Sequence, residues 1–345
     1  MRPIDETTGL AVGTFGLAKL SDGKRAFHAL VRPNGEVIDI SGRFATSQEI
    51  YGDWEQNFEE LSRLNAAQGA SDLHLAGFTI LPPTDYPQIL GAGSNYRRHA
   101  AEMYTYNEGN YQKSRKPGES DEEFYARNLE FVEKKRATGM PFIWLSTHGS
   151  QIGANDDIAL PPIGVQHDWE AELGVVIGGG APRFMTPSEA GRYIAGYTIA
   201  NDMHTCELFN RNDIKWNADW IAKQQPGFKP IGPFVVPRQF FEDLDDVIIK
   251  LAVNGEVKQD WPVSDMIFSS EEYVAYASER LNLLPGDVLM TGSPPGNGAV
   301  HGQFLKAGDT VDIAISYLGR QHNTVIDEDS GGRKPHFGLP PGAVD

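Results

Sequence analysis

The stretch HDWEAELGVVIG (residues 167–178) predicts a β-strand that carries two carboxylates at its start. Residues 173–177 are free of charge, and the run ends at three consecutive glycines. Side chains two positions apart point to the same side of a strand, so Glu170 and Glu172 lie next to each other. Like charges in such positions repel. The pattern therefore indicates either an exposed edge strand or a bound cation.

A third acid, Asp202, follows the apolar run GYTIAN, at the point where that run ends. Three carboxylates provide only oxygen ligands, which suit Mg²⁺, Mn²⁺ or Ca²⁺ and not Zn²⁺. We therefore predict a divalent cation on Glu170, Glu172 and Asp202, with Mg²⁺ as the first candidate. The alternative, in which both glutamates face solvent, stays open on spacing alone.

The segment GSNYRRHAAEM contains a second group of reactive side chains. His99 and Glu102 are three residues apart, so they share one face of a helical turn. A carboxylate can stabilise the imidazolium that forms when histidine accepts a proton, and such a pair can activate water. The alternative is an exposed helical turn with an ordinary histidine.

Two further features carry polar groups that could hold a substrate. The turn TGSPPGNG (residues 291–298) follows a predicted strand and offers backbone N–H groups and hydroxyls to an anion, with Gly292 and Ser293 as candidates. Lys223 precedes an apolar strand and could hold an enolate or a carboxylate. The alternatives are that the turn is an ordinary loop and that Lys223 is an ordinary surface lysine.

Composition excludes several classes of function. The 345-residue chain has a formal net charge of −17, which repels nucleic acid and anionic lipid, so neither is expected as a partner. We find no Walker loop, no apolar stretch of about 18 residues and no apolar core of a signal peptide near the start. The single cysteine, Cys206, excludes an internal disulfide and favours the cytoplasm.

The chain divides into three predicted parts. Residues 1–85 form a small β-rich domain with hairpin turns near Gly23 and Gly35 and a helix over 53–68. Residues 86–327 are a strand-rich α+β body, because short strands alternate with Gly/Pro turns and not with regular helices. Residues 103–140 interrupt it with a polar, lid-like insertion that contains one amphipathic helix, capped by Ser120, although a solvated surface insertion explains them equally well. Residues 328–345 form an irregular tail.

The order of these motifs resembles the fumarylacetoacetate hydrolase family. The resemblance covers about residues 91–319 without the insertion, and its motifs are GSNYRRHAAE, DWEAELGVVIG, GYTIAND, a lysine ahead of KPIGPFVV, VNGEVKQ and LLPGDVLMTGSPPGNG. It implies a mixed β-roll or β-sandwich with a small N-terminal domain, assembled as a homodimer. Agreement of several weak motifs in one order makes the solvent-facing alternatives much less favoured.

The resemblance also implies roles for individual residues. It implies Mg²⁺ or another divalent ion on the three carboxylates, a catalytic pair on a mobile segment, a catalytic lysine, and groups that bind the substrate. The corresponding residues are Glu170, Glu172 and Asp202 for the metal, His99, Glu102 and Lys223 for catalysis, and Tyr96, Gly292 and Ser293 for the substrate. We add Arg211 or, alternatively, His204 as a candidate partner for a substrate carboxylate.

The sequence departs from the family pattern where the substrate is held. Cys206 and Phe209 align with an arginine and a glutamine that bind a substrate carboxylate in the family, and Ser146 aligns with a second lysine. We therefore expect a substrate that is less anionic, bulkier or more aromatic than a short acylpyruvate. The aromatic residues that could line its pocket are Tyr104, Tyr106, Trp144, Trp169, Phe209 and Trp216.

Three functions follow from this sequence. The main prediction is a hydrolase that cleaves a C–C bond of a β-diketone or acylpyruvate-type small molecule, with water activated by His99 and Glu102 and an enolate stabilised by the metal. The alternative is a decarboxylase, hydratase or isomerase of 2-oxo acids at the same metal site. A non-catalytic member that keeps only the fold is the third possibility.

Overall fold

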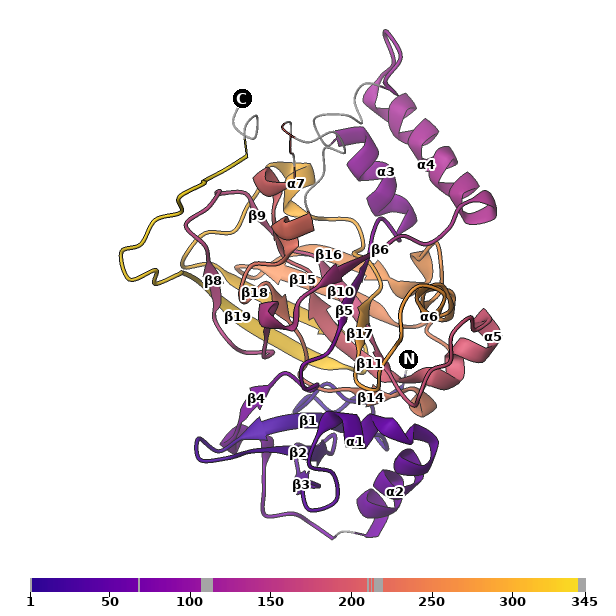
Figure 1. Ribbon diagram of the computed structural model, residues 1–345, viewed down its shortest axis with the longest axis vertical. Coiled ribbons are helices and arrows are strands. Elements are labelled where there is room, and N and C mark those ends of the chain that lie inside the picture. Colours follow the sequence, from indigo (N-terminus) through magenta and orange to yellow (C-terminus); the bar gives the residue numbers. More distant parts are fainter. Residues whose placement is uncertain are drawn as a thin grey trace.

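The computed structural model describes residues 2–67, 69–106, 114–209, 211, 213 and 220–340. The lid-like insertion and the tail therefore fall partly outside the described residues, and the predicted pocket residue Trp216 falls wholly outside them. Figure 1 shows a strand-rich body with a separate small sheet below it and a pair of helices above it.

A six-stranded mixed sheet forms the centre of the body. Its strands pair in the order β14 (Val236–Pro237), β11 (Ile194–Asn201), β10 (Ala171–Ile177), β17 (Val288–Met290), β5 (Ile89–Ala92) and β6 (Ile143–Ser146). Every residue of β10 and β11 is buried. The stretch predicted as one strand at 167–178 is interrupted: β9 (His167–Asp168) and β10 are separate strands, and Glu170 lies between them. Glu172 is 1% exposed and the Glu170 side chain is 12% exposed, so the solvent-facing alternative for the two glutamates is wrong.

A second mixed sheet and two short ladders complete the body. The five-stranded sheet has the order β16 (Glu256–Pro262), β15 (Ile248–Val253), β18 (Thr310–Ile315), β19 (Gly319–Asp327) and β8 (Ile158–Leu160). The ladders join β12 (His204–Thr205) to β9 (His167–Asp168) and β13 (Lys229–Pro230) to β7 (Gln151–Ile152). The short helices α5 (Pro187–Ala190) and α7 (Gly298–His301) and the longer α6 (Ser270–Ser278) connect these strands. The strand-rich α+β prediction is confirmed.

The N-terminal residues form a four-stranded sheet with two helices. The strand order is β3 (Val37–Asp39), β2 (Ala26–Val31), β1 (Gly16–Ser21) and β4 (Thr79–Leu81), with α1 (Ser47–Gly52) and α2 (Trp54–Ala67) alongside. Both predicted hairpins and the predicted helix are therefore confirmed, because β1, β2 and β3 pair antiparallel across the two turns. The domain boundaries themselves stay predictions.

The N-terminal sheet shares a core with the body. Leu17 and Val235 exchange both backbone hydrogen bonds at 2.8 Å, so β1 pairs directly with the segment before β14. One apolar cluster joins Phe15, Tyr51 and Trp54 to Val176 and Val288 of the central sheet. Burial of these large side chains is worth about 1.5–3 kcal/mol each, so the contact fixes the small sheet on the body.

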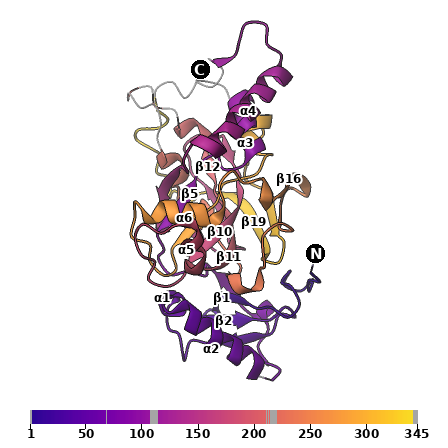
Figure 2. The same ribbon diagram turned by 90° about the vertical axis from the view of Figure 1, so that its right-hand side faces the viewer.

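Two helices stand at the opposite end from the N-terminal sheet, as both views show (Figures 1 and 2). They are α3 (Arg97–Tyr106) and α4 (Asp121–Thr138), which pack on each other, and α3 also contacts α7. Ser120 caps α4 through the predicted capping box, and the helix ends at Gly139. Its buried residues are Phe124, Asn128 and Val132, so the helix has one buried face as predicted, although Asn128 makes part of that face polar.

Two predictions about the chain as a whole have partial answers. The described part of the tail, residues 328–340, contains no helix or strand. Among the described residues, no helix is both long and apolar enough to cross a membrane.

Asp85 ties three elements of the N-terminal region together. Its carboxylate accepts hydrogen bonds from the Lys19 ammonium, from His28 Nε2 at 3.0 Å and from the Ser47 backbone N–H at 2.8 Å. Although burial raises the pKa of Asp85, these donors outweigh it and hold the pKa far below its usual value. Ser47 also accepts from the Asp85 N–H at 2.7 Å, which closes the network.

We expect the Asp85→Asn variant to lose about 2 kcal/mol of folding free energy at neutral pH, because it removes a partly buried ion pair. The folded-state pKa of Asp85 is depressed, so its contribution is present above the unfolded-state pKa of about 3.9 and is lost as the pH falls below it. The stability difference between the two proteins should therefore shrink in acid. Denaturant unfolding at several pH values tests this, with the exposed Asp72→Asn as control; an equal or larger difference in acid would contradict it.

Candidate active site

The pairing of β10 with β11 assembles the three predicted metal ligands. The two strands are antiparallel with Ala171 opposite Asn201, so the residues just outside them, Glu170 and Asp202, also face each other. A 2.9 Å hydrogen bond from the Asp202 N–H to the Glu170 carbonyl confirms this register. Glu172 lies two residues along the same strand. Carboxylate oxygens of the three residues lie within 4.8 Å of one another.

Burial makes it costly to keep these three carboxylates ionised. Glu172 and Asp202 are each 1% exposed. Burial, followed by repulsion from Asp202 and Glu170, raises the pKa of Glu172 well above its usual value. Burial also raises the pKa of Glu170, to about 8, against the attraction of Lys223. The site thus holds more negative charge than its surroundings readily stabilise.

Two buried lysines provide part of the missing positive charge. Lys223 Nζ lies 2.5 Å from Glu170 Oε2 and 2.6 Å from Asp202 Oδ2. Lys229 Nζ lies 3.0 Å from Asp202 Oδ1 and is completely buried. Although burial raises the pKa of Asp202, the two ammonium groups outweigh it and keep this pKa below the usual value. Asp202 is therefore an anion at neutral pH.

The two lysines are held differently. Lys229 donates to the carbonyls of Met203, Lys223 and Phe228 at 3.1, 2.6 and 3.1 Å, so its ammonium has a complete set of acceptors. Lys223 has the two carboxylates as its main partners. Lys223 also donates to the Asp202 carbonyl at 3.4 Å, but its short contacts are with carboxylates and can be exchanged for a substrate oxygen, whereas Lys229 is fixed by the backbone around it.

Trp144 forms a floor beneath both ammonium groups. Its ring centre lies 5.3 Å from Lys223 Nζ and 5.6 Å from Lys229 Nζ, within the range of cation–π attraction. A Cβ atom at Gly91 would lie 2.2 Å from this ring, so the neighbouring strand β5 needs glycine there.

The glycine-rich turn after β17 orients the glutamates. The Gly292 N–H donates to Glu172 Oε2 at 2.7 Å, and Asn297 Nδ2 donates to Glu170 Oε1 at 3.0 Å. Gln259 from β16 donates to Ser293 Oγ at 2.9 Å and to the Pro294 carbonyl at 2.7 Å, which braces the turn. Gly292 has φ +95°, a conformation that favours glycine.

His99 and Glu102 lie together on α3, as predicted, but they do not contact each other through a hydrogen bond. Both side chains retain a buried atom without a partner among the described residues, His99 Nδ1 and Glu102 Oε2. Burial and the charge of Lys223 lower the pKa of His99 to about 4. Burial raises the pKa of Glu102 to about 7, although the Gly296 N–H opposes this shift. The histidine is therefore neutral near pH 7.

The remaining predicted substrate residues have other partners. Tyr96 is completely buried in the main core cluster, and Ser293 is 3% exposed beside Gln259. Arg211 forms a two-pronged ion pair with Asp213 at 2.7 Å on each side. The substrate roles given to Tyr96, Gly292, Ser293 and Arg211 stay predictions.

Sequence reasoning missed two residues that act directly on the carboxylates. Lys229 looked like part of an apolar strand, although a charged residue inside FKPIGPFVV was a usable signal. Asn297 stood within the quoted glycine-rich turn but carried no separate prediction. Neither residue could be assigned from sequence spacing, because each is distant along the chain from the carboxylate that it contacts.

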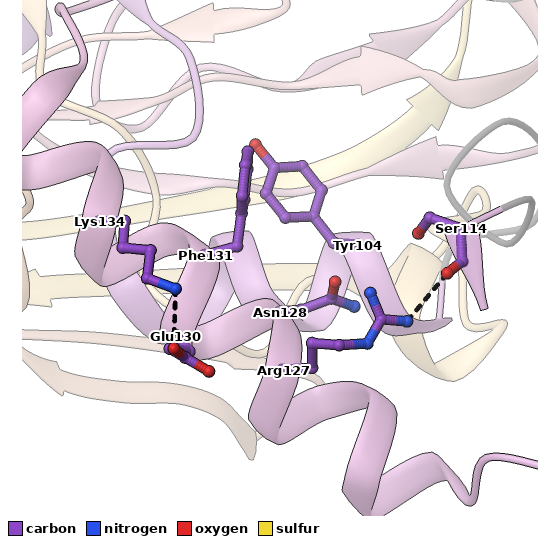
Figure 3. Close-up of a pocket in the computed structure, with 7 residues that line it drawn as sticks. All are labelled: Tyr104, Ser114, Arg127, Asn128, Glu130, Phe131 and Lys134. Atoms are coloured by element: carbon purple, nitrogen blue, oxygen red, sulfur yellow. Dashed lines mark hydrogen bonds and ion pairs between the residues drawn. The ribbon is translucent and has the colours of Figure 1, made fainter. Parts of the chain in front are cut away.

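A cavity of about 590 Å³ lies on α3 and α4, away from the carboxylates (Figure 3). Tyr104 meets Phe131 edge-on there, with ring centres 6.1 Å apart. Of the other aromatic residues predicted to line a substrate pocket, Trp144 and Trp169 are 5% and 1% exposed. Trp144 lies beneath the lysines, and Trp169 donates to the Gly296 carbonyl at 3.1 Å.

The donor set fits a hard divalent cation. Three carboxylates that already attract the Lys223 ammonium offer only oxygen, and two of them are oriented by a second layer of N–H donors. Such outer donors fix ligands for a metal. The arrangement can therefore hold an ion such as Mg²⁺ or Mn²⁺ beside a neutral imidazole.

Comparison with known proteins finds similar chains. The chain is 35% identical over 188 residues to a mitochondrial oxaloacetate tautomerase of Rattus norvegicus, and 36% identical over 190 residues to a 2,4-didehydro-3-deoxy-L-rhamnonate hydrolase of Sphingomonas sp. (strain SKA58). Each alignment covers 54% of this chain and 59% or 65% of the relative. The chain thus spans less than two thirds of the length of these relatives.

Solved structures share the fold at lower identity. Maleylpyruvate hydrolase from Sphingobium sp. SYK-6, in complex with manganese(II) and pyruvate, matches 91% of this chain and all of its own with a TM-score of 0.67 and 20% identity. The 2-hydroxyhepta-2,4-diene-1,7-dioate isomerase from Mycobacterium marinum matches 92% of this chain and all of its own with a TM-score of 0.63 and 23% identity.

The family model described as fumarylacetoacetate (FAA) hydrolase C-terminal matches residues 88–326, which contain the central sheet, the carboxylates, both lysines and the glycine-rich turn. With the fold and this match in agreement, the chain belongs to the fumarylacetoacetate hydrolase family.

Proposed function

We propose that the protein is a divalent-metal-dependent hydrolase that cleaves a C–C bond of a β-diketone or acylpyruvate-type small molecule. The observation that carries this proposal is the buried cluster of Glu170, Glu172 and Asp202 beside a neutral His99. A bound Mg²⁺ or Mn²⁺ would polarise the substrate carbonyl and lower the cost of enolate charge. The maleylpyruvate hydrolase of similar fold contains manganese and pyruvate, which supports such an ion.

The chain's own residues would supply the proton transfers. His99 is neutral and buried, so it can accept a proton from water that attacks the carbonyl. Glu102 lies one helical turn away and stabilises the resulting imidazolium when it is ionised. Lys223 carries a positive charge next to the carboxylates and can hold the enolate oxygen after the C–C bond breaks. Asn297 and Gly292 keep the glutamates in place meanwhile.

A tautomerase or isomerase of 2-oxo acids is the second candidate, and one observation favours it. A neutral imidazole and a carboxyl group with a pKa of about 7 on one helical turn can pass a proton between carbon and oxygen in either direction. The curated relatives include both an oxaloacetate tautomerase and a sugar-acid hydrolase. Both reactions require the same metal cluster.

The finer predictions on assembly and location belong to this proposal. We propose a homodimer, as the family resemblance implies, and Mg²⁺ as the native ion. A cytoplasmic location is proposed from the single cysteine, while several relatives are mitochondrial by name. The exchange of a family arginine for Cys206 favours a substrate with a weaker demand for carboxylate binding.

A paired assay distinguishes the two reactions. Purified protein with Mg²⁺ is given acylpyruvates of increasing bulk, with acid release as the readout, and separately enol oxaloacetate, with loss of enol absorbance as the readout. We expect acid release that stops when the metal is chelated. Enol loss without acid release from any acylpyruvate would replace the hydrolase by the tautomerase, and neither signal would reject both.

The His99→Ala variant should lower kcat about 10²–10⁴-fold, because it removes the base, and should leave Mn²⁺ affinity unchanged. For the wild type we expect kcat/KM to fall as the pH drops below about 7, since Glu102 must be ionised to stabilise the imidazolium. Glu102→Gln should abolish this acid limb, because His99 stays neutral until about pH 4. An unchanged acid limb in Glu102→Gln would assign it to another group.

The Asn297→Ala variant should weaken Mn²⁺ binding about 10-fold or more, as loss of outer donors to metal ligands typically does. The reason is that Glu170 Oε1 loses its 3.0 Å amide donor and its fixed orientation. Calorimetric titration of Mn²⁺ measures the effect. Asn65→Ala, which removes a contact with Arg32 in the N-terminal region, is the matched control and should bind Mn²⁺ like the wild type. Equal affinity for all three proteins would contradict an orienting role.

A further inference from the structure

A second group of potential metal ligands is chemically different from the carboxylate cluster. Asp168, His204 and Cys206 each offer one donor atom, and these atoms all lie within 4.8 Å of one another. The proposed reaction uses none of the three. Oxygen, nitrogen and sulfur donors together suit Zn²⁺ and similar ions, whereas three carboxylates suit Mg²⁺.

The backbone brings these three side chains to one face of a short ladder. Asp168 on β9 and His204 on β12 are directly opposite partners. The Cys206 N–H donates to the Gln166 carbonyl at 2.9 Å, so the pairing continues beyond β12. Cys206 begins the 3-10 turn Cys206–Leu208 that directly follows β12, and this hydrogen bond holds it beside the ladder. The juxtaposition of Asp168 and His204 therefore follows from strand register, and that of Cys206 from the turn that ends the ladder.

Asp168 has acceptor capacity left on the side of His204. Its Oδ1 accepts from the N–H groups of Trp169 at 2.8 Å and Gly298 at 2.7 Å, and its Oδ2 accepts from Ala299 at 2.8 Å. A carboxylate oxygen can accept two hydrogen bonds, so Oδ2 retains one site. This oxygen lies 3.9 Å from His204 Nε2.

His204 is a buried ring with one nitrogen, Nδ1, that the fold does not satisfy. His204 is 5% exposed, and its Nδ1 makes no hydrogen bond with any described residue. The Asp202 carbonyl lies beside the ring without completing such a bond. Phe209 packs against the imidazole with ring centres 5.2 Å apart and limits its rotation. An imidazole held in this way is suited to bind a metal.

The distance between the His204 and Asp168 donor atoms is close to the one that a bound Zn²⁺ requires. Zinc bonds of about 2.0–2.2 Å at a tetrahedral angle place two N or O donors about 3.4 Å apart. His204 Nε2 and Asp168 Oδ2, at 3.9 Å, would have to approach by about 0.5 Å, which small side-chain rotations allow.

The charge of this region also favours a second cation. Five carboxylates are gathered here, on Asp168, Glu170, Glu172, Asp202 and Glu207, against the two ammonium groups of Lys223 and Lys229. The carboxylates outnumber the ammonium groups, so this region attracts further positive charge.

We propose that Asp168, His204 and Cys206 form a second metal site, selective for Zn²⁺-class ions, beside the hard-cation site of Glu170, Glu172 and Asp202. Three protein ligands leave a fourth tetrahedral position for water or a substrate oxygen, as in open zinc sites.

Cobalt(II) is the direct probe of this site, because a thiolate bound to it gives a near-ultraviolet charge-transfer band. The chain has a single cysteine, so such a band can arise only from Cys206. In saturating Mg²⁺ we expect the full-length protein to develop the band with one Co²⁺ per chain. Cys206→Ser and His204→Gln should lack it, with thermal unfolding midpoints that show both variants to be folded.

The Glu172→Gln variant separates this inference from the proposed function. It should weaken binding at the carboxylates and keep the Co²⁺ band, whereas loss of the band there would mean that Cys206 serves the first ion and that no second site exists. As an independent measurement, Zn²⁺ should slow alkylation of Cys206 about tenfold or more, and Mg²⁺ should not, since a metal-bound thiolate is shielded. No band and no protection in the folded wild type, or a band that persists in His204→Gln, would overturn the proposal.

Discussion

The antiparallel pairing of β10 with β11 is the constraint on which the active site depends. It places Glu170 opposite Asp202 at the end of a fully buried ladder, with Glu172 on the same face. Buried carboxylates are costly unless they are paired. The surrounding elements place a partner at each carboxylate. Lys223 and Lys229 form ion pairs with Asp202, the Gly292 N–H donates to Glu172, and the Asn297 amide donates to Glu170.

These partners do not neutralise the cluster, and the proposed chemistry depends on that deficit of positive charge. Lys229 is fixed by three carbonyls and keeps Asp202 anionic, while Lys223 shares its charge between Glu170 and Asp202. A divalent cation would compete for the same carboxylate oxygens that Lys223 contacts. Its binding would therefore release the lysine toward a substrate oxygen. The same incomplete balance of charge thus lets the lysines stabilise the carboxylates without a metal and would leave the carboxylates able to bind one.

The sequence predicts those features that depend on local periodicity. The two-residue spacing of Glu170 and Glu172, the three-residue spacing of His99 and Glu102, and the capping box at Ser120 all concern neighbours along the chain. It could not predict that the amide of Asn297 reaches Glu170, or that Lys229 reaches Asp202 from within an apolar run. It could not show that Glu102 and His99 do not bond to each other, because the Gly296 N–H that acts on Glu102 comes from a distant loop. Such contacts depend on the long-range register of strands and turns.

The proposed second metal site suggests a physical reason for one departure from the family pattern, at Cys206. The family resemblance aligns Cys206 with an arginine that holds a substrate carboxylate, and on that alignment this chain lacks the guanidinium. Cys206 shares its ladder face with His204 and Asp168. An ion bound by these three would place positive charge near the position of the missing guanidinium and would offer an open coordination site to an anionic oxygen. Substrate affinity would then depend on a Zn²⁺-class ion as well as on the catalytic cation, even for a substrate that is less anionic than a short acylpyruvate.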